Sequence, residues 1–146
     1  MKVVILSGGF GTRISEYTEM IPKPMIEIGE LPIILHIMDI YSFYGHNDFY
    51  IALGYKGELI KEYFRDLSTI KKDFKINLET GDINFIKSES LKQRNWNITL
   101  VDTGLNSLTG RRVKLMKPYL ENDTFFLTYG DGLTDINLDT LLEFHK

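Results

Sequence analysis

The feature that most constrains the fold is a short apolar segment at the N-terminus that runs directly into a glycine-rich loop. Residues 2–6 read Lys-Val-Val-Ile-Leu, a run typical of a strand that is buried on both faces. Residues 7–13 then read Ser-Gly-Gly-Phe-Gly-Thr-Arg. Glycines let the backbone approach a ligand closely and present its N–H groups to an anion. The segment therefore favours an α/β fold with an anion-binding loop after its first strand.

Apolar strands and helical segments then alternate along the chain. We expect further strands at residues 49–53, 98–101 and 124–128. Helices are expected from Pro32 onward and over 58–64, 111–120 and 138–144. Ser107 or Thr109 is the expected N-cap of the third helix, and Asp135 that of the last. This alternation predicts an α/β, three-layer fold: a mostly parallel sheet with helices on both faces.

The region from about residue 74 to residue 97 has a different pattern. Phe74, Ile76 and Leu78 alternate with polar residues, as do Ile83 and Phe85, and a Gly-Asp pair stands between them. This pattern predicts a small, hairpin-like β insertion. With no repeat or linker elsewhere, we expect residues 1–146 to form a single domain.

Three polar or glycine-containing loops follow three of the expected strands. They begin at Ser7, at Gly54 and at Tyr129. In an open parallel sheet, ligands bind beyond the carboxyl ends of the strands. The sequence therefore predicts one ligand site at a single edge of the sheet.

The composition excludes several classes of function. The chain has 17 basic and 20 acidic residues, a net charge of −3, so nothing indicates a nucleic-acid partner. It has no cysteine, which excludes disulfides and thiolate metal sites. No apolar run reaches the length of a signal-peptide core or of a membrane span. We therefore expect a cytoplasmic protein with no membrane association.

Two motifs carry a resemblance to a known family. The sequence G-G-x-G-T-R at 8–13, followed by P-K-P-M at 22–25, resembles the signature of sugar-phosphate nucleotidyltransferases. Other segments narrow the resemblance to the glucose-1-phosphate cytidylyltransferases, and Val101-Asp102-Thr103-Gly104 points most directly to that branch. The remaining matches are residues 27–29, 36–38, 54–57, 61–64 and 129–132.

The resemblance implies a Rossmann-like nucleotidyltransferase fold and a specific reaction. CTP and glucose 1-phosphate would give CDP-glucose and pyrophosphate with Mg²⁺, for use in deoxysugar and surface-polysaccharide synthesis. We also expect a homo-oligomer. Enzymes of this family are longer, and the part beyond this N-terminal portion carries a second metal-binding aspartate and most of the sugar-phosphate pocket. We therefore expect a fold that is incomplete at its C-terminus and a chain that is not a competent enzyme alone. The alternatives are an enzyme that uses UTP or dTTP, and a truncated, non-catalytic nucleotide-binding module.

Nucleotidyl transfer depends on positioning and on neutralising the charge that develops on the phosphates. Arg13 is expected to clamp the β- and γ-phosphates and Lys23 to contact the α-phosphate. Asp131 is a candidate Mg²⁺ ligand, and these three residues form the predicted catalytic set. By resemblance, the loop after residue 102 reads the base. The predicted nucleotide-binding residues are Leu6, Ser7, Gly8, Gly9, Phe10, Gly11, Thr12, Arg13, Lys23, Thr103, Gly104, Ser107, Arg112 and Gly130. Ser7 stands where the family usually has alanine.

Overall fold

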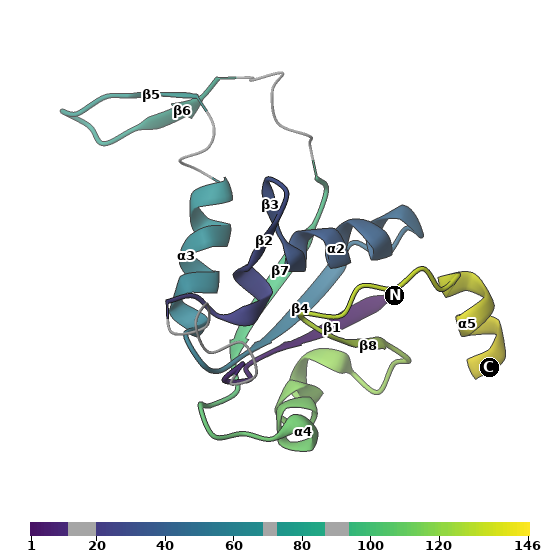
Figure 1. Cartoon of the computed structure of the whole chain (residues 1–146). Helices are drawn as coiled ribbons and strands as arrows, with labels where there is room; N and C mark the ends of the chain where they lie inside the picture. Colours follow the sequence, from purple (N-terminus) through teal and green to yellow (C-terminus); the bar gives the residue numbers. More distant parts are fainter. Residues whose placement is uncertain (12–19, 69–72, 87–93) are drawn as a thin grey trace.

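The fold is built on a central sheet whose strands all run parallel (Figure 1). The computed structural model describes residues 1–11, 20–68, 73–86 and 94–146. The sheet contains β1 (Lys2–Ser7), β4 (Asp48–Leu53), β7 (Asn97–Asp102) and β8 (Phe126–Tyr129), in the order β7-β4-β1-β8. The prediction of a mostly parallel sheet with helices on both faces is confirmed.

The order of the strands decides which face each helix covers. The chain moves in one direction from β1 to β4 to β7, through α2 (Ile33–Phe43) and α3 (Gly57–Ser68). It then returns past β1 to β8 through α4 (Thr109–Leu120). Because crossovers between parallel strands are right-handed, reversing the direction places α4 on the face opposite α2 and α3. α5 (Leu138–His145) follows β8.

Alternate residues of β1 belong to two separate cores. Val3 and Ile5 pack in a cluster with the buried side chains of α2 and α3, whereas Val4 and Leu6 pack with Met116 and other residues of α4. This is the two-residue period of a strand whose faces are both covered. Burial on both sides explains why residues 3–6 are continuously apolar.

Two small antiparallel pairs extend the fold. β2 (Glu27–Ile28) pairs with β3 (Leu31–Pro32) just before α2, and a short 3₁₀ helix, η2 (Lys23–Met25), precedes them. β5 (Phe74–Ile76) pairs with β6 (Ile83–Phe85), and this hairpin projects away from the central sheet in Figure 1. The alternating residues of segment 74–85 therefore form a hairpin whose side chains are exposed.

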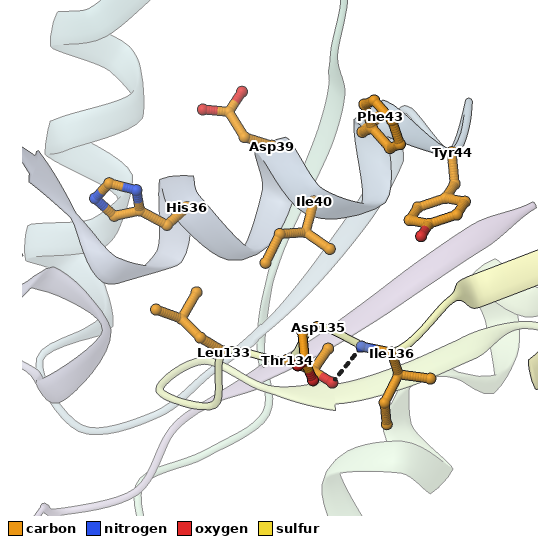
Figure 2. A pocket seen from close by; sticks show the side chains of 9 residues that line it. All are labelled: His36, Asp39, Ile40, Phe43, Tyr44, Leu133, Thr134, Asp135 and Ile136. Atoms are coloured by element: carbon orange, nitrogen blue, oxygen red, sulfur yellow. Dashed lines mark hydrogen bonds between the residues drawn. The ribbon is translucent and has the colours of Figure 1, made fainter.

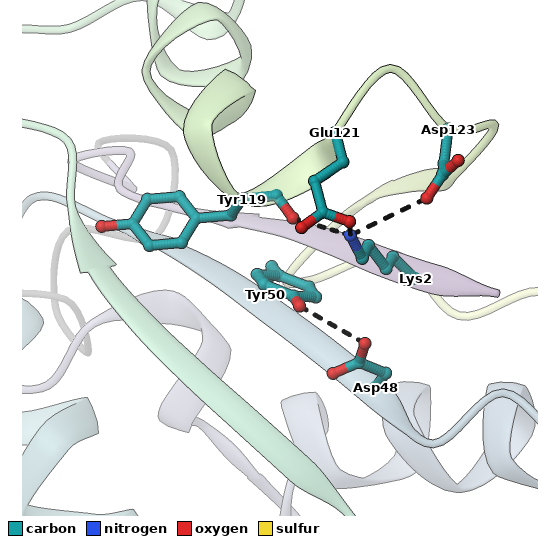
Figure 3. A network of polar contacts seen from close by, with 6 residues as sticks. All are labelled: Lys2, Asp48, Tyr50, Tyr119, Glu121 and Asp123. Atoms are coloured by element: carbon teal, nitrogen blue, oxygen red, sulfur yellow. Dashed lines mark hydrogen bonds and ion pairs between the residues drawn. The ribbon is translucent and has the colours of Figure 1, made fainter.

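The amino end of the sheet is fastened to the turn after α4 by Lys2 (Figure 3). Its ammonium donates to the carbonyl of Tyr119 at 2.9 Å and pairs with Glu121 at 3.3 Å and Asp123 at 3.9 Å. Glu121 has a left-handed backbone, with φ of 55°, and forms the C-cap of α4. A lysine at this point supplies a donor to the last turn of a helix, whose carbonyls lack partners within the helix.

The expected helix caps were wrong. The N-cap of α4 is Leu108, which makes no side-chain capping bond, so neither Ser107 nor Thr109 has that role. The N-cap of α5 is Asn137, whose side chain accepts from the N–H of Thr140 at 3.0 Å, in place of Asp135. Asn and Asp are almost equally good caps, so composition could not decide between the two positions. Among the described helices, none has the length and apolar character needed to cross a bilayer.

Candidate active site

A pocket of about 670 Å³ lies at the carboxyl edge of the sheet, where β1 and β8 end. This is the side of β1 at which the strand order reverses, the usual ligand position in open parallel sheets. Its lining comes from segments far apart in the sequence: the ends of β1 and β8, the start of η2, the loop after β7 and the first turns of α4. The lining residues are Leu6, Ser7, Gly8, Gly9, Phe10, Gly11, Lys23, Pro24, Leu105, Asn106, Ser107, Leu108, Thr109, Arg112, Tyr129 and Asp131.

The glycine-rich loop presents its glycines in different ways. The buried Gly8 accepts through its carbonyl a bond from the Tyr55 N–H at 3.2 Å. Gly9 is exposed, and a Cβ there would meet nothing within 4 Å. Gly11 has φ of 66°, a left-handed conformation that favours glycine. The outer part of the loop is therefore open toward the pocket, while Gly8 belongs to the packed sheet edge.

Lys23 and Asp131 meet as an ion pair on the pocket wall, each with 31% of its side chain exposed. Lys23 opens η2, where Pro24 is buried and the Met25 N–H donates to the Pro22 carbonyl at 2.8 Å. The position of Asp131 is fixed by the preceding Gly130, whose N–H donates to the Leu6 carbonyl at 2.9 Å. The structure thus brings together two of the three predicted catalytic residues.

Gly130 keeps the two charged segments close together. A Cβ on it would lie 2.5 Å from Ser7 Oγ and 2.9 Å from Pro24 Cγ, nearer than real contacts allow. The Ser7 hydroxyl beside it is buried and has no hydrogen-bond partner among the described residues. Gly130 is not itself in the pocket lining. Its contribution to the site is that it has no side chain, which lets the segments of Ser7 and Pro24 lie close to it.

Asp131 fits a cation whose coordination is completed by phosphate oxygens. The described residues contain no group of three or more His, Cys, Asp or Glu side chains that could enclose a metal ion. Mg²⁺ usually takes one or two carboxylates together with substrate phosphates, so a single carboxylate on a pocket wall suits it.

Hydrogen bonds within the loop after β7, and from this loop to the end of β4, fix its conformation. The buried Thr103 donates its hydroxyl to the Leu53 carbonyl at 2.6 Å, and the Ser107 hydroxyl donates to the Thr103 carbonyl. The N–H of Gly104 donates to the Asp102 carboxylate at 2.8 Å. Thr103 and Gly104 are outside the pocket lining and shape the loop, whereas Ser107 lies on the pocket surface.

Arg112 is buried beneath this loop, with only 4% of its surface exposed. Its two terminal nitrogens donate to four carbonyls and to the Thr103 hydroxyl. Burial lowers the pKa of the guanidinium from its ordinary value, and the nearby Asp102 carboxylate acts in the opposite direction. The sequence predicted that this arginine reaches a phosphate; in the structure Arg112 belongs to the pocket lining, and its terminal N–H groups donate to backbone carbonyls and to the Thr103 hydroxyl.

The predicted Thr12 and Arg13 lie outside the described residues. Other lining residues were missed by sequence reasoning: Pro24, Leu105, Asn106, Leu108, Thr109 and Tyr129. Each is next to, or within two residues of, a predicted site residue. The sequence therefore indicated which loops form the site, but it did not indicate which side chains in those loops face the pocket.

A second pocket, of about 550 Å³, lies between α2 and residues 133–136 (Figure 2). His36, Asp39, Ile40, Phe43 and Tyr44 line it from the helix. His36 Nε2 hydrogen-bonds to the Ile28 carbonyl at 2.9 Å, and Asp39 receives two bonds from Arg94 at 3.1 and 2.9 Å. His36 and Asp39 are therefore already used within the fold, and Asp135 is a further carboxylate in the lining.

A parallel sheet with a glycine-rich loop, a lysine and a carboxylate at its switch point places the chain among the open α/β proteins that bind ligands at this edge. The model of the nucleotidyl transferase family matches residues 2–146, and the chain belongs to that family. The family generally uses divalent metal ions, which agrees with the single carboxylate at Asp131.

Within this family, the chain is similar in sequence to curated glucose-1-phosphate cytidylyltransferases. The chain is 47% identical over 146 residues to the probable glucose-1-phosphate cytidylyltransferase of Bacillus subtilis. It is 46% identical over 147 aligned residues to the glucose-1-phosphate cytidylyltransferase of Salmonella typhimurium. Both matches cover 100% of this chain and 56% of the relative, so the chain spans about half the length of these proteins.

Solved structures share the fold. The chain aligns with HddC from Yersinia pseudotuberculosis complexed with GMP-PN at a TM-score of 0.67 and 23% identity, over 97% of this chain and 52% of that one. It also aligns with a UDP-glucose pyrophosphorylase complexed with UDP-glucose at a TM-score of 0.67 and 18% identity. This alignment covers 99% of this chain and 53% of the pyrophosphorylase chain. At these identities the likeness is one of fold.

Proposed function

We propose that this protein is a glucose-1-phosphate cytidylyltransferase, which converts CTP and glucose 1-phosphate to CDP-glucose and pyrophosphate. The observation that carries the proposal is the single pocket in which the glycine-rich loop, Lys23, Asp131 and the loop after β7 converge. The choice of cytidine and glucose is supported by the named activities of relatives that are 46–47% identical.

Each group in the pocket has a role in this reaction. An oxygen of the sugar phosphate attacks the α-phosphorus of CTP, and the bond from that phosphorus to the pyrophosphate oxygen breaks. The backbone N–H groups of the glycine-rich loop bind phosphate oxygens, and Lys23 neutralises the charge that develops near the α-phosphate. Asp131 holds Mg²⁺, which would shield the phosphate charges when bound. Arg13 clamps the outer phosphates in this proposal.

The Lys23–Asp131 ion pair holds the phosphate-binding lysine and the metal-binding aspartate of this proposal side by side. An ammonium and a carboxylate in direct contact keep both side chains at the pocket wall. When substrate binds, Asp131 exchanges the lysine ammonium for a divalent cation, and Lys23 exchanges the aspartate carboxylate for a phosphate oxygen. Each side chain therefore keeps a partner of opposite charge to its own. Such groups are preorganised for a charged substrate and need little movement to reach it.

The remaining parts of the proposal concern organisation. Residues 1–146 form one nucleotidyltransferase domain with a β insertion at about 74–97. The protein works as a homo-oligomer in the cytoplasm, with Mg²⁺ as its metal ion and with no nucleic-acid or membrane partner. Residues 103–112 read the base, Ser107 from the pocket surface and Thr103, Gly104 and Arg112 by shaping the loop.

The test is a turnover assay with a panel of nucleotides. A protein that contains this chain together with the C-terminal portion expected of the family is incubated with glucose 1-phosphate, Mg²⁺ and CTP, UTP or dTTP, and pyrophosphate and the sugar nucleotide are quantified. We expect CDP-glucose and pyrophosphate in equal amounts, with CTP preferred. A preference for UTP or dTTP would contradict the assignment of the base, and nucleotide binding without product would favour a non-catalytic module.

A further inference from the structure

Arg112 lies where three neighbouring strands of the sheet end. Its guanidinium donates to the Gly8 carbonyl after β1 at 2.8 Å, and to the Leu53 carbonyl at the end of β4 at 2.9 Å. It donates to the Gly104 carbonyl after β7, also at 2.9 Å. β1, β4 and β7 are adjacent in the sheet, so one side chain joins the carboxyl ends of all three.

Further bonds tie Arg112 to the loop after β7. One terminal nitrogen also donates to the Thr103 hydroxyl at 2.7 Å and the other to the Leu105 carbonyl at 3.2 Å. A planar guanidinium can reach several acceptors at once because its N–H donors form a rigid fork. A lysine ammonium is a compact point charge and cannot span the same set of acceptors.

Two glycines provide the space for this guanidinium. A Cβ on Gly8 would lie 2.2 Å from Nη1 and 2.3 Å from Cζ of Arg112, and one on Gly54 would lie 2.5 Å from Nη1. Real Cβ atoms do not come so close to other atoms, so residues 8 and 54 must lack a side chain while Arg112 is in place. Gly9 lines the same pocket, yet a Cβ there meets nothing within 4 Å.

We propose that Arg112 is a positioning residue, which holds the glycine-rich loop and the loop after β7 at a fixed separation. The first of these loops receives the phosphates and the second the base, so this inference rests on the proposed function. Arg112 belongs to the pocket lining, and its positioning role acts through the backbone carbonyls of the loops. The guanidinium leaves no room for a side chain at residue 8, whereas at residue 54 a Cβ is excluded both by the guanidinium and by the Gly8 carbonyl, which would lie 2.7 Å from it.

The first experiment is a double-mutant cycle on thermal stability, measured without nucleotide. Gly8→Ala should lower Tm by about 5 °C or more in the wild-type background, because its methyl group displaces the guanidinium. In an Arg112→Ala background the same change should cost less than half as much, since the clash is absent. Gly9→Ala is the matched control and should cost equally little in both backgrounds. Additive effects of Gly8→Ala and Arg112→Ala would overturn the proposal.

The second experiment measures the affinity for CTP with Mg²⁺ by calorimetry. Arg112→Lys should weaken binding by about tenfold or more, since it retains the charge but not the fork. Gly54→Ala should also weaken binding, although Gly54 is not among the residues that line the pocket. Wild-type affinity in Arg112→Lys would overturn the proposal, and this variant keeps the test decisive if Arg112→Ala does not fold. A wild-type protein that binds no nucleotide would contradict the proposed function, while the stability cycle would still decide the role of Arg112.

Discussion

The Lys23 ammonium and the Asp131 carboxylate form an ion pair across the wall of the candidate active site. The two residues come from opposite parts of the sequence, one from η2 and the other from the turn after β8. In the proposed reaction they act on different partners, a phosphate oxygen and a divalent cation. The pair therefore links the proposed catalytic lysine to the proposed metal ligand, and the two roles can be tested separately.

In an enzyme that also contains the C-terminal portion expected of the family, Lys23→Ala should reduce kcat by about a hundredfold or more while substrate binding changes less. The reason is that a group that stabilises charge chiefly in the transition state contributes to kcat more than to affinity. Steady-state kinetics with CTP and glucose 1-phosphate measure the effect, and Lys114→Ala, an exposed lysine of α4, is the control. A kcat equal to that of the wild type would remove Lys23 from the mechanism.

Replacing Lys23 with methionine should strengthen the binding of Mn²⁺ in the absence of nucleotide. A cation at Asp131 must compete with the lysine ammonium, so loss of that ammonium should improve the affinity by about threefold to tenfold. Electron paramagnetic resonance of free Mn²⁺ measures the binding. Asp131→Asn should abolish the same binding, and persistence of binding in that variant would place the metal elsewhere.

Ser7→Ala should stabilise the fold by about 1 kcal/mol, because a buried hydroxyl without a partner destabilises the folded state. Denaturant unfolding measures the change. Ser42→Ala is the matched control, since the Ser42 hydroxyl donates to the Asn47 side chain and its loss should be destabilising. A Ser7→Ala variant that is clearly less stable than the wild type would mean that this hydroxyl has a partner in solution.

His46 should make stability dependent on pH. Burial lowers its pKa from the ordinary value of 6.5, and the N-terminal ammonium, 3.4 Å from Nδ1, acts in the same direction, while Asp139 opposes them. The unfolded chain therefore binds the proton more readily than the folded one, so stability is fully present above about pH 6.5 and is lost as pH falls through the folded pKa. Chemical unfolding between pH 5 and pH 8 tests this. His46→Gln should flatten the dependence, and His145→Gln, at an exposed histidine, should not.

Much of the fold follows from patterns that are local in the sequence. The expected strand at 98–101 lies within β7, and the helix expected from Pro32 begins at Ile33. These elements are predictable because burial on both faces requires continuous apolar runs and a helix requires its own period. The loops that begin at Ser7 and Tyr129 meet in one pocket because their strands are parallel, whereas the loop that begins at Gly54 lies outside the pocket lining.

The parts that could not be predicted depend on contacts between distant segments. The bond from Arg112 to Gly8 joins residues 104 positions apart, and nothing local shows that the arginine is buried. The same holds for Gly8, which a sequence pattern assigns to a phosphate-binding loop although its lack of a side chain accommodates Arg112. Motifs therefore located the site, but packing decided which residues face it.

The most direct test of the account is the thermal protection of the protein by different nucleotides. At equal concentration and with Mg²⁺, a ligand that binds only the folded state raises Tm according to its affinity. We predict that CTP raises Tm more than UTP or dTTP, because in the proposed function the loop after β7 reads cytosine while the glycine-rich loop and Lys23 hold the phosphates. Equal protection by all three nucleotides, or protection by none, would contradict a cytidine-specific nucleotide site at this edge of the sheet.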